Sequence, residues 1–425
     1  MIAKPQTVPP GLHLHQSGAF AVELVTDPER FRSLKTEWDA LWTRCGAKGI
    51  FQTFDCCLHM WEAIAQPEGR TLFCLVGWDH GRMVAVWPLT TQRRLAWKVL
   101  RPLEATGAEY VNILIDSTID AQSWIASAFQ FAVRRSRCDF ALLAYVRVGT
   151  ELNRALHLFL SSAKGTDAGP EAGEGTRCPL RGTLDTVPVL RGFLKNSTIE
   201  PDIGAYARLS EARDWESYYS SLSDRHRRNH ESLRRRLANL GEVRFEIVEA
   251  GDPRCSGLIR WMLDQKKTWC ERTNKKGHWV FSDHYRDFLT RLLSRPGTSS
   301  RAILLVLTLN SEPVAAKLGA ITISLLELLI AGFDPRYAKY SPGMRLDEYW
   351  VRWAVEQKLD CDFGNGSERY KKFWSRDNIV ETSRYLIPNS LWGRVFLQLR
   401  SWAKQVRQLK AKPMPVTKVG KFSCL

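Results

Sequence analysis

Several features that would assign this chain to a specialised class are missing from its sequence. The longest apolar runs, such as residues 302–307, are far shorter than the roughly 20 residues that a membrane-spanning helix needs. The stretch before residue 17 contains no apolar core of the kind found in signal peptides. We therefore expect a cytoplasmic protein, one that can reach the inner membrane only as a peripheral protein.

Metal and disulfide chemistry also lack their usual signals. The ten Cys residues are scattered without any Cys-x-x-Cys pair, and several lie inside apolar runs. We interpret them as reduced, mostly buried small side chains. The chain contains no His-Glu-x-x-His or similar ligand spacing, so the sequence predicts no metal site.

Acidic residues are scarce relative to basic ones, and none occurs after Glu381. The net charge of +16 should attract a polyanion, which could be nucleic acid, anionic lipid, or a phosphorylated substrate or cofactor. The excess is concentrated in residues 225–236 and in the tail after Gly393.

A chain of 425 residues is too long for one ordinary core, so two domains are the default. Residues 161–176 are small, polar and Gly-rich, as expected for a linker or exposed loop. Both halves show two helices, a hairpin-based sheet, a helix and a strand in the same order, which indicates a structural duplication. We predict an N-terminal unit at 17–162, a linker at 163–202, a C-terminal unit at 203–390, and a basic helix and tail at 391–425.

Hydrophobic periodicity predicts the elements of each half. In the first half we expect helices at 28–44, 54–65, 121–134 and 151–161, and strands at 19–25, 71–78, 83–92, 99–103, 110–115 and 139–145. In the second half we expect helices at 257–272 and 282–293, a β-meander at 302–309, 314–323 and 325–333, a helix after Gly343, a strand at 359–363, a helix at 367–374 and a strand at 379–387. The third strand of the meander is apolar except for Glu327. The fold class is α/β, with mostly antiparallel mixed sheets flanked by helices.

Tyr340-Ser341-Pro342-Gly343 follows a strand and opens a helix. The first N–H groups of such a helix are unpaired, and together with the helix dipole they form an anion site. A glycine there lets the backbone approach a phosphate closely. The alternative is an ordinary capped helix, with Ser341 as N-cap and Pro342 as the first helical residue.

A second group of polar residues surrounds the strand end Asp362-Phe363-Gly364-Asn365-Gly366. Glu368, Tyr370 and Lys371 follow at the start of the next helix, where they could orient an acceptor, stabilise an oxyanion or relay a proton. The alternative is a structural ion pair between Glu368 and a lysine at helical spacing. Asp334, at the end of the meander, is a further candidate base, with a simple Asp turn before Pro335 as the alternative.

The ordered set Phe333-Asp334, Ser341-Pro342-Gly343, Asp362-Phe363-Gly364-x-Gly366, Glu368, Tyr370-Lys371 and Trp374 resembles the CelD/BcsL-type acetyltransferases, a branch of the GNAT superfamily associated with cellulose biosynthesis. The sequence departs from the pattern at Phe333, where the family has Tyr. It also lacks the Gln/Arg-x-x-Gly-x-Gly phosphate loop of ordinary GNAT enzymes.

The resemblance implies two tandem GNAT-like units, of which the first is expected to be non-catalytic. It also implies direct acyl transfer, without a metal, from acetyl-CoA or another acyl-CoA to an amine or hydroxyl, in exopolysaccharide or cell-envelope synthesis. The catalytic candidates are Asp334, Asp362, Glu368, Tyr370 and Lys371. The residues expected to bind the acyl-CoA are Tyr340, Ser341, Gly343, Met344 and Arg345. The residues expected to bind the small-molecule or glycan-precursor acceptor are Arg228, Arg235, Gly364, Gly366 and Trp374.

Two basic helices leave other partners open. The helix carrying residues 225–236 could clamp phosphates, bind nucleic acid, or present a solvated basic face. Residues 394–410 can form an amphipathic basic helix, suited to an anionic membrane surface or to packing on the last domain. The alternative functions are a Fem-like transferase that uses aminoacyl-tRNA, a nucleic-acid-binding protein without a recognised motif, and a non-catalytic scaffold.

Overall fold

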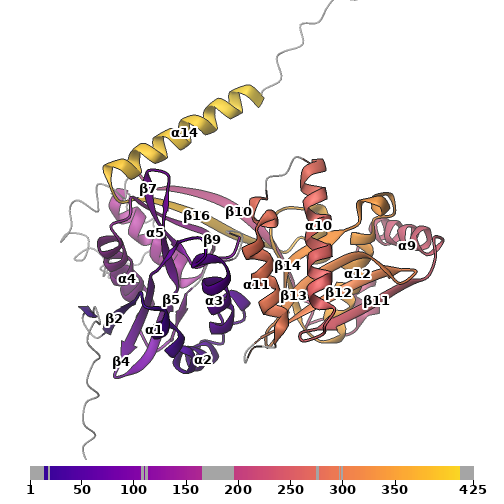
Figure 1. The fold of residues 1–425 in the computed structure, drawn as a ribbon, viewed down its shortest axis with the longest axis horizontal. Helices are drawn as coiled ribbons and strands as arrows, with labels where there is room; N and C mark the ends of the chain where they lie inside the picture. The colour runs from indigo at the N-terminus through magenta and orange to yellow at the C-terminus, as the bar shows by residue number, and fades with distance from the viewer. Residues whose placement is uncertain are drawn as a thin grey trace, which may run out of the picture.

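The computed structural model describes residues 14–17, 20–106, 110, 113–164, 196–273, 277–295, 297 and 300–411. Two α/β halves lie side by side, each with a sheet covered by helices (Figure 1). The sheets are mostly antiparallel, as the sequence predicted. Most of the predicted linker and the end of the tail lie outside the described residues.

The elements of the first half follow the predicted order. Its helices are α1 (Pro28–Ser33), α2 (Lys35–Arg44), η1 (Ile50–Gln52), α3 (Phe54–Met60), η2 (Trp61–Ala65), α4 (Ala121–Ser136) and α5 (Glu151–Lys164). Its strands are β1 (Leu14–Ser17), β2 (Phe20–Val25), β3 (Thr71–Leu72), β4 (Cys74–Asp79), β5 (Arg82–Trp87), β6 (Leu89–Arg94), β7 (Trp97–Pro102), β8 (Leu114–Ile115) and β9 (Phe140–Arg147). The single helix expected at 28–44 is divided at Leu34 into α1 and α2.

The second half contains the meander and the helices that follow it. Its helices are α8 (Trp215–Ser220), α9 (Asp224–Ala238), α10 (Cys255–Thr273), η3 (His278–Phe281), α11 (Asp283–Ser294), η4 (Pro335–Tyr340), α12 (Pro342–Glu356), α13 (Arg369–Ser375) and α14 (Leu391–Ala411). Its strands are β10 (Thr198–Ala207), β11 (Val243–Glu249), β12 (Arg301–Leu309), β13 (Glu312–Ile321), β14 (Leu325–Phe333), β15 (Asp360–Asn365) and β16 (Ile379–Pro388). The sequence patterns missed β11, and the predicted boundary at residue 203 falls inside β10.

The strand order shows how the two halves are joined. An eleven-stranded sheet runs β11-β12-β13-β14-β15-β10-β16-β9-β7-β6-β3, and a smaller sheet runs β1-β2-β4-β5-β8. Each half contains one parallel pair, β7 with β9 and β14 with β15. Strand β10 pairs with β15 on one edge and with β16 on the other, and β16 pairs on its far edge with β9 of the first half. Strand β16 therefore joins the strands of the two halves into one continuous sheet.

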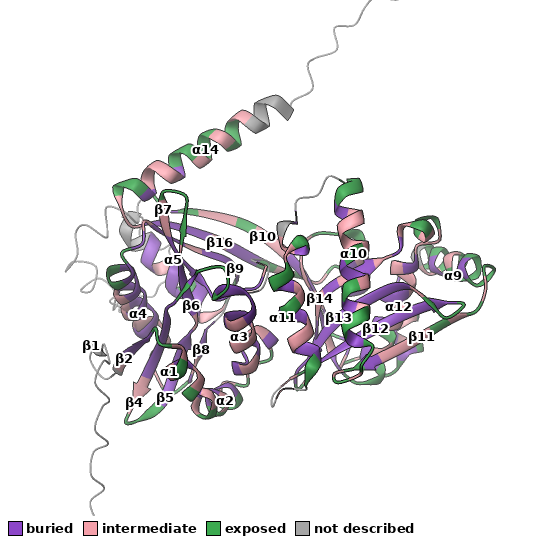
Figure 2. Ribbon diagram, in the orientation of Figure 1, coloured by how far each residue is buried: buried purple, intermediate pink, exposed green. Residues whose placement is uncertain are grey.

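The apolar core also continues across the two halves. One buried cluster unites α1–α3 with α10, α11 and β12, and includes Trp38, Phe54, Ile259 and Phe288. Figure 2 shows the buried strands between more exposed helices. Arg291 of α11 adds an ion pair at 3.2 Å to Glu62 of the first half. Shared core and shared strands fix the two halves relative to each other. Among the described helices, none combines the length and apolar character required to cross a membrane.

Candidate active site

The parallel strands β14 and β15 separate after three paired residues. Their register joins Leu325 with Asp360 and ends at Glu327 with Asp362. On its other edge β15 pairs with β10 from Cys361 to Asn365, through an irregular register. Strand β14 continues to Phe333 with no partner on that edge among the described residues. Its free N–H and C=O groups can pair with an extended ligand that carries amides.

A cavity of about 260 Å³ lies at the far end of this open edge, and we call it the α12 cavity. Gly343 and Met344 line it from the start of α12, and Glu368 and Tyr370 line it from the next helix. The remaining walls come from α10, β13 and the end of β14. The structure thus brings the two separate sequence motifs to a single cavity.

The start of α12 is open toward an anion. Ser341 adopts left-handed backbone angles, with φ 51° and ψ 54°, and its side chain makes no capping hydrogen bond to the helix. Ser341 is thus the N-cap residue and Pro342 the first helical residue, as the alternative held, but the hydroxyl of Ser341 does not occupy the helix start. A Cβ added at Gly343 would meet only Phe333, at 3.7 Å, so no steric contact within the chain requires glycine here. The first turn of this helix keeps the partial positive charge that favours phosphate.

Basic residues from another element lie beside this helix start. Arg236 of α9 donates to the carbonyl of Lys339 at 3.1 Å and lies 5.8 Å from the ring of Tyr340. The ammonium of Lys339 is 4.9 Å from the same ring. Arg345, predicted to bind the acyl-CoA, instead pairs with Glu348 and Tyr349 of its own helix. Arg236 and Lys339 are thus two cations close to the helix start, and Lys266 of α10 lines the same cavity.

Glu368 and Lys371 form the ion pair that the sequence allowed, at 3.2 Å. Lys371 also donates to the backbone carbonyl of Asn365, and burial lowers its pKa. Glycine suits position 366 because its φ of 115° lies in a region that other residues rarely adopt. These contacts hold residues 365–371 in place beside the α12 cavity. Burial raises the pKa of Tyr370, whose phenol therefore stays protonated at neutral pH.

A buried ion pair that the sequence did not reveal also lines the α12 cavity. Lys317 of β13 contacts Asp347 of α12, and both side chains are almost fully buried. Burial lowers the pKa of Lys317. The Lys317 ammonium is 5.4 Å from the ring of Tyr370. This pair ties the meander to α12 and places two charges at the cavity wall.

A second hollow, of about 380 Å³, lies between the two halves, and we call it the interunit cleft. The first half lines it with Gln52, Tyr110 and Arg147, and the second half lines it with Tyr206 and Glu327. A smaller cavity of about 60 Å³ shares Tyr110 and Glu327 with the cleft and adds Asp362 and Gly364. Both hollows meet at the point where β14 and β15 separate.

The carboxylates at this point are deeply buried. Glu327 is 5% exposed and Asp362 is 1% exposed. Burial, with a contribution from the neighbouring Asp362, raises the pKa of Glu327 to about 8. Burial also raises the pKa of Asp362, which Arg147 of the first half offsets through a direct ion pair. Glu327, with a pKa of about 8, is therefore suited to exchange a proton near neutral pH, while Arg147 favours the charged form of Asp362 beside it.

Backbone contacts from the first half fix Glu327. The N–H of Ile50 donates to Glu327 Oε2, across 277 positions of the chain. The N–H of Gly364 donates to Asp362 Oδ1 at 2.8 Å, so that both carboxylates are oriented. The guanidinium of Arg147 stacks 4.0 Å from the ring of Tyr110. A Cβ at Gly204 would overlap the Tyr110 hydroxyl, so this glycine makes room for the phenol.

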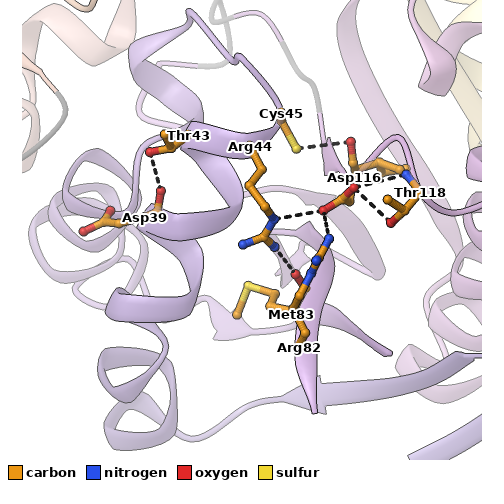
Figure 3. Close-up of polar contacts among 9 residues, drawn as sticks. Asp39, Thr43, Arg44, Cys45, Arg82, Met83, Asp116 and Thr118 are labelled. Carbon is orange, nitrogen blue, oxygen red and sulfur yellow. Dashed lines mark hydrogen bonds and ion pairs between the residues drawn. The ribbon is translucent and has the colours of Figure 1, made fainter. Parts of the chain in front are cut away.

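An ion cluster holds the first-half wall of the interunit cleft in place (Figure 3). Asp116 accepts from Arg44 at 2.9 Å and from Arg82 at 2.6 Å, and these contacts hold its pKa well below its usual range despite burial. The thiol of Cys45 donates to the carbonyl of Ile115 at 3.1 Å. Since Cys45 and Ile115 both line the cleft, this cluster supports its wall. Burial raises the pKa of the Cys45 thiol to about 11, which makes it a poor nucleophile.

Several residues predicted to act in catalysis or to bind the acceptor are not among those that line the cavities. Asp334 caps η4 by accepting the N–H of Arg336 at 2.8 Å and pairs with the guanidinium of the same residue. Trp374 is fully buried in the core around Trp215, so its placement gives it no contact with an acceptor. Arg228 and Arg235 are exposed on α9, away from the residues that line the interunit cleft. The predicted acceptor residues Gly364 and Gly366 remain at the strand end, and Gly364 lines the smaller cavity.

Sequence reasoning did not select Glu327, Arg147, Tyr110 or Lys317. The only available signal was a charged residue inside an apolar strand pattern, at Glu327 and at Lys317. Nothing local marked Arg147 or Tyr110, whose partners are distant in sequence. Among the described residues, no group of three or more His, Cys, Asp or Glu side chains is arranged to hold a metal ion.

Comparison with known proteins identifies an acetyltransferase (GNAT) domain in the second half of the chain. The sequence model of the acetyltransferase (GNAT) domain matches residues 224–372, which include the meander, α12, β15 and the start of α13. No curated protein sequence matches the chain. A crystal structure of FemX is similar over 85% of this chain and 98% of its own, with a TM-score of 0.54 and 12% identity. This likeness concerns the fold.

Two other solved structures are similar with lower scores. L-PGS from Bacillus licheniformis covers 90% of this chain and 98% of its own, at 11% identity and a TM-score of 0.47. A tandem GNAT protein from the clavulanic acid biosynthesis pathway covers 87% of this chain and 99% of its own, at 8% identity and a TM-score of 0.45.

Proposed function

Because residues 224–372 match the GNAT acetyltransferase domain, we propose that this chain transfers an acyl group from an acyl-CoA thioester to an amine or hydroxyl. The donor would enter from the α12 cavity and the acceptor from the interunit cleft. One observation carries the proposal. An uncapped helix start and a buried carboxyl of raised pKa lie at the two ends of one unpaired strand edge.

The donor site would use the chain's own backbone. The first turn of α12 would hold the pyrophosphate, with Arg236 and Lys339 beside it. From Phe333 back to Glu327, β14 spans about 20 Å, at roughly 3.4 Å per residue. A ligand reaching from one end to the other must therefore be long and extended, and the free edge of β14 offers hydrogen bonds along its length. An acyl-CoA supplies a thioester at the end of such an arm.

Glu327 would act as the general base. Its carboxylate accepts the proton of the attacking amine or hydroxyl as the nucleophile bonds to the thioester carbon. The C–S bond then breaks, and the proton that Glu327 accepted passes to the departing thiolate, which restores the base. A base whose pKa lies near the working pH is suited to this exchange, and burial gives Glu327 a pKa of about 8. The ion pair with Arg147 favours the charged form of Asp362 and so counters the effect of burial on that carboxyl.

The first half would then contribute to the acceptor site although it is not expected to bind the donor. Gln52, Tyr110 and Arg147 face the cleft with hydrogen-bonding groups, and Ile50 orients the base. A polar acceptor of modest size fits a hollow of about 380 Å³. The further proposal that the acceptor belongs to exopolysaccharide, cellulose or cell-envelope synthesis is supported by the resemblance of the motifs alone.

The decisive test is the thermal stability of the wild type, Gly343→Ala and Gly343→Glu with and without acetyl-CoA and longer acyl-CoAs. A ligand that binds only the folded state stabilises it by about 2.7 kcal/mol at 100 times its Kd. Gly343→Ala should fold normally, because the added Cβ meets only Phe333 at an ordinary distance. Gly343→Glu should abolish the ligand-induced shift, because it brings a carboxylate to the anion site. Absence of a shift in the wild type with any acyl-CoA would refute the thioester donor.

A second donor class is favoured by one specific observation, the fold similarity to FemX. The tandem architecture of this chain resembles that of the Fem ligases, which use aminoacyl-tRNA. The exposed arginines of α9, such as Arg228 and Arg235, would then bind the tRNA backbone. Binding of tRNA that competes with acyl-CoA would support this alternative. Equal binding of tRNA and unrelated DNA, with steep salt dependence, would indicate plain nucleic-acid binding.

A further inference from the structure

The β6–β7 hairpin and the start of α14 form a surface that belongs to neither cavity. We call it the hairpin patch. It presents large apolar side chains to solvent. Leu95 at the tip of the hairpin is 91% exposed and Leu391 is 72% exposed. Trp392 follows at 48%, and its indole N–H donates to the carbonyl of Ala96 in the hairpin tip at 3.1 Å.

The exposed leucine lies where the backbone disfavours it. Arg94 pairs with Trp97, which leaves a two-residue turn formed by Leu95 and Ala96. Leu95 has a φ of 52°, whereas Ala96 is not in the left-handed region. The first central position of such a hairpin turn normally carries glycine. A leucine there is unfavourable both for the backbone and for hydration, so the folded chain alone gives no reason for it.

The hairpin patch is firmly mounted. Asp139 accepts the Lys98 N–H at 2.7 Å and the Ser390 hydroxyl at 2.8 Å, which joins the hairpin to the start of α14. Trp97 stacks on Trp392 at 5.6 Å. Gly393 is needed for the close packing of α14, since a Cβ would overlap the Asp139 carbonyl. These contacts fix the hairpin and the start of α14 relative to each other, so the exposed apolar side chains are held in place on the surface.

The two segments that carry these apolar side chains are basic. Residues 93–98 carry three cations, residues 391–411 carry five, and neither stretch contains a carboxylate. Glu200 offsets part of this charge through its contacts with Arg400 and Lys404. Further along α14, Leu399 is 52% exposed and Trp402 is 65% exposed. Figure 1 shows α14 extending away from both halves, so most of its length is accessible.

We propose that the hairpin patch and α14 dock the protein on an anionic phospholipid bilayer. Leucines and tryptophans would enter the boundary between headgroups and acyl chains, and the surrounding lysines and arginines would contact the lipid phosphates. Charge complementarity selects this occupant, since a second copy of the chain would bring an equally basic surface against it. The interaction does not depend on the acyltransferase activity.

Co-sedimentation of the full chain with vesicles tests the docking. The wild type should bind phosphatidylcholine vesicles that contain phosphatidylglycerol, bind pure phosphatidylcholine poorly, and be partly released by high salt. Leu95→Gly should weaken partitioning about tenfold, and Leu95→Gly with Leu391→Ser about a hundredfold. Ile323→Ser, which changes a side chain that is 74% exposed in the β13–β14 turn, is the matched control and should leave binding unchanged.

Stability separates docking from a structural role. Leu95→Gly relieves the positive φ and should melt at or above the temperature of the wild type while binding vesicles more weakly. Unchanged vesicle binding in the double variant would overturn the proposal. So would a wild type that fails to bind anionic vesicles, or a change from dimer to monomer by light scattering in the double variant, which would assign the surface to a second copy.

Discussion

Replacing Glu327 by glutamine removes the proposed base while keeping the size of its side chain. The amide oxygen of glutamine can still accept the Ile50 N–H, so the variant should fold. If Glu327 takes the proton of the acceptor, Glu327→Gln should lower the turnover by about 10²–10⁴-fold. The wild type should gain activity as pH rises toward about 8, where the carboxyl ionises, and the variant should lose this dependence.

The same substitution has a predictable effect on stability. The pKa of Glu327 is about 8 in the folded chain against a reference of 4.5. Between these values the folded state holds a proton that the unfolded state has released. The free energy of unfolding of the wild type should therefore fall by up to about 1.4 kcal/mol for each pH unit over this window. From pH 5.5 to 7.5, Glu327→Gln should gain about 2–3 kcal/mol relative to the wild type by the same relation.

Urea unfolding at several pH values measures this gain, and turnover against pH measures the catalytic effect. Glu356→Gln is a suitable control, because Glu356 is a half-exposed glutamate in a helical ion pair with Arg352. That change should stay within about 0.5 kcal/mol at every pH. Parallel stability curves for the wild type and Glu327→Gln would refute the raised pKa. A variant that retains the wild-type turnover and pH profile would refute the assignment of the base.

Two further predictions concern the buried Lys317–Asp347 ion pair and the carboxylate of Asp334. Lys317→Met should destabilise the fold by about 3–5 kcal/mol in urea unfolding, since it leaves Asp347 buried without its partner. Adding Asp347→Leu should restore much of this loss, and a double variant as unstable as the single one would contradict the pairing argument. Asp334→Asn keeps an oxygen that can cap η4 and should leave the turnover unchanged, whereas loss of about 10²–10⁴-fold would restore Asp334 as the base.

The elements of the second half could be predicted because their signals are local. The apolar runs at β12, β13 and β14, the Pro342-Gly343 helix start and the glycines after Asp362 all act within a few residues. Hydrophobic periodicity therefore located the meander and the helix that follows it. The same local chemistry identified Gly343, Met344, Glu368 and Tyr370, which the structure places around one cavity.

The roles of individual side chains were less predictable. Asp334, Trp374 and Arg345 carry suitable chemistry at suitable places in the sequence, yet the structure engages them in a cap, a core and a helical ion pair. Side chains with functional chemistry also serve as caps and packing elements, and sequence spacing alone does not distinguish these uses. Only the neighbours in space reveal which contact is made.

The sequence by itself determined most of the succession of helices and strands, the basic character of α9 and α14, and the start of a helix at Pro342-Gly343. Tertiary structure alone decided that β16 pairs with β9 and so joins the two halves in one sheet. It also brought Arg147 to Asp362 and Ile50 to Glu327, across 215 and 277 positions. Strand pairing between distant segments and the pKa of a buried carboxyl both depend on which surfaces exclude water together, and that property belongs to the folded chain.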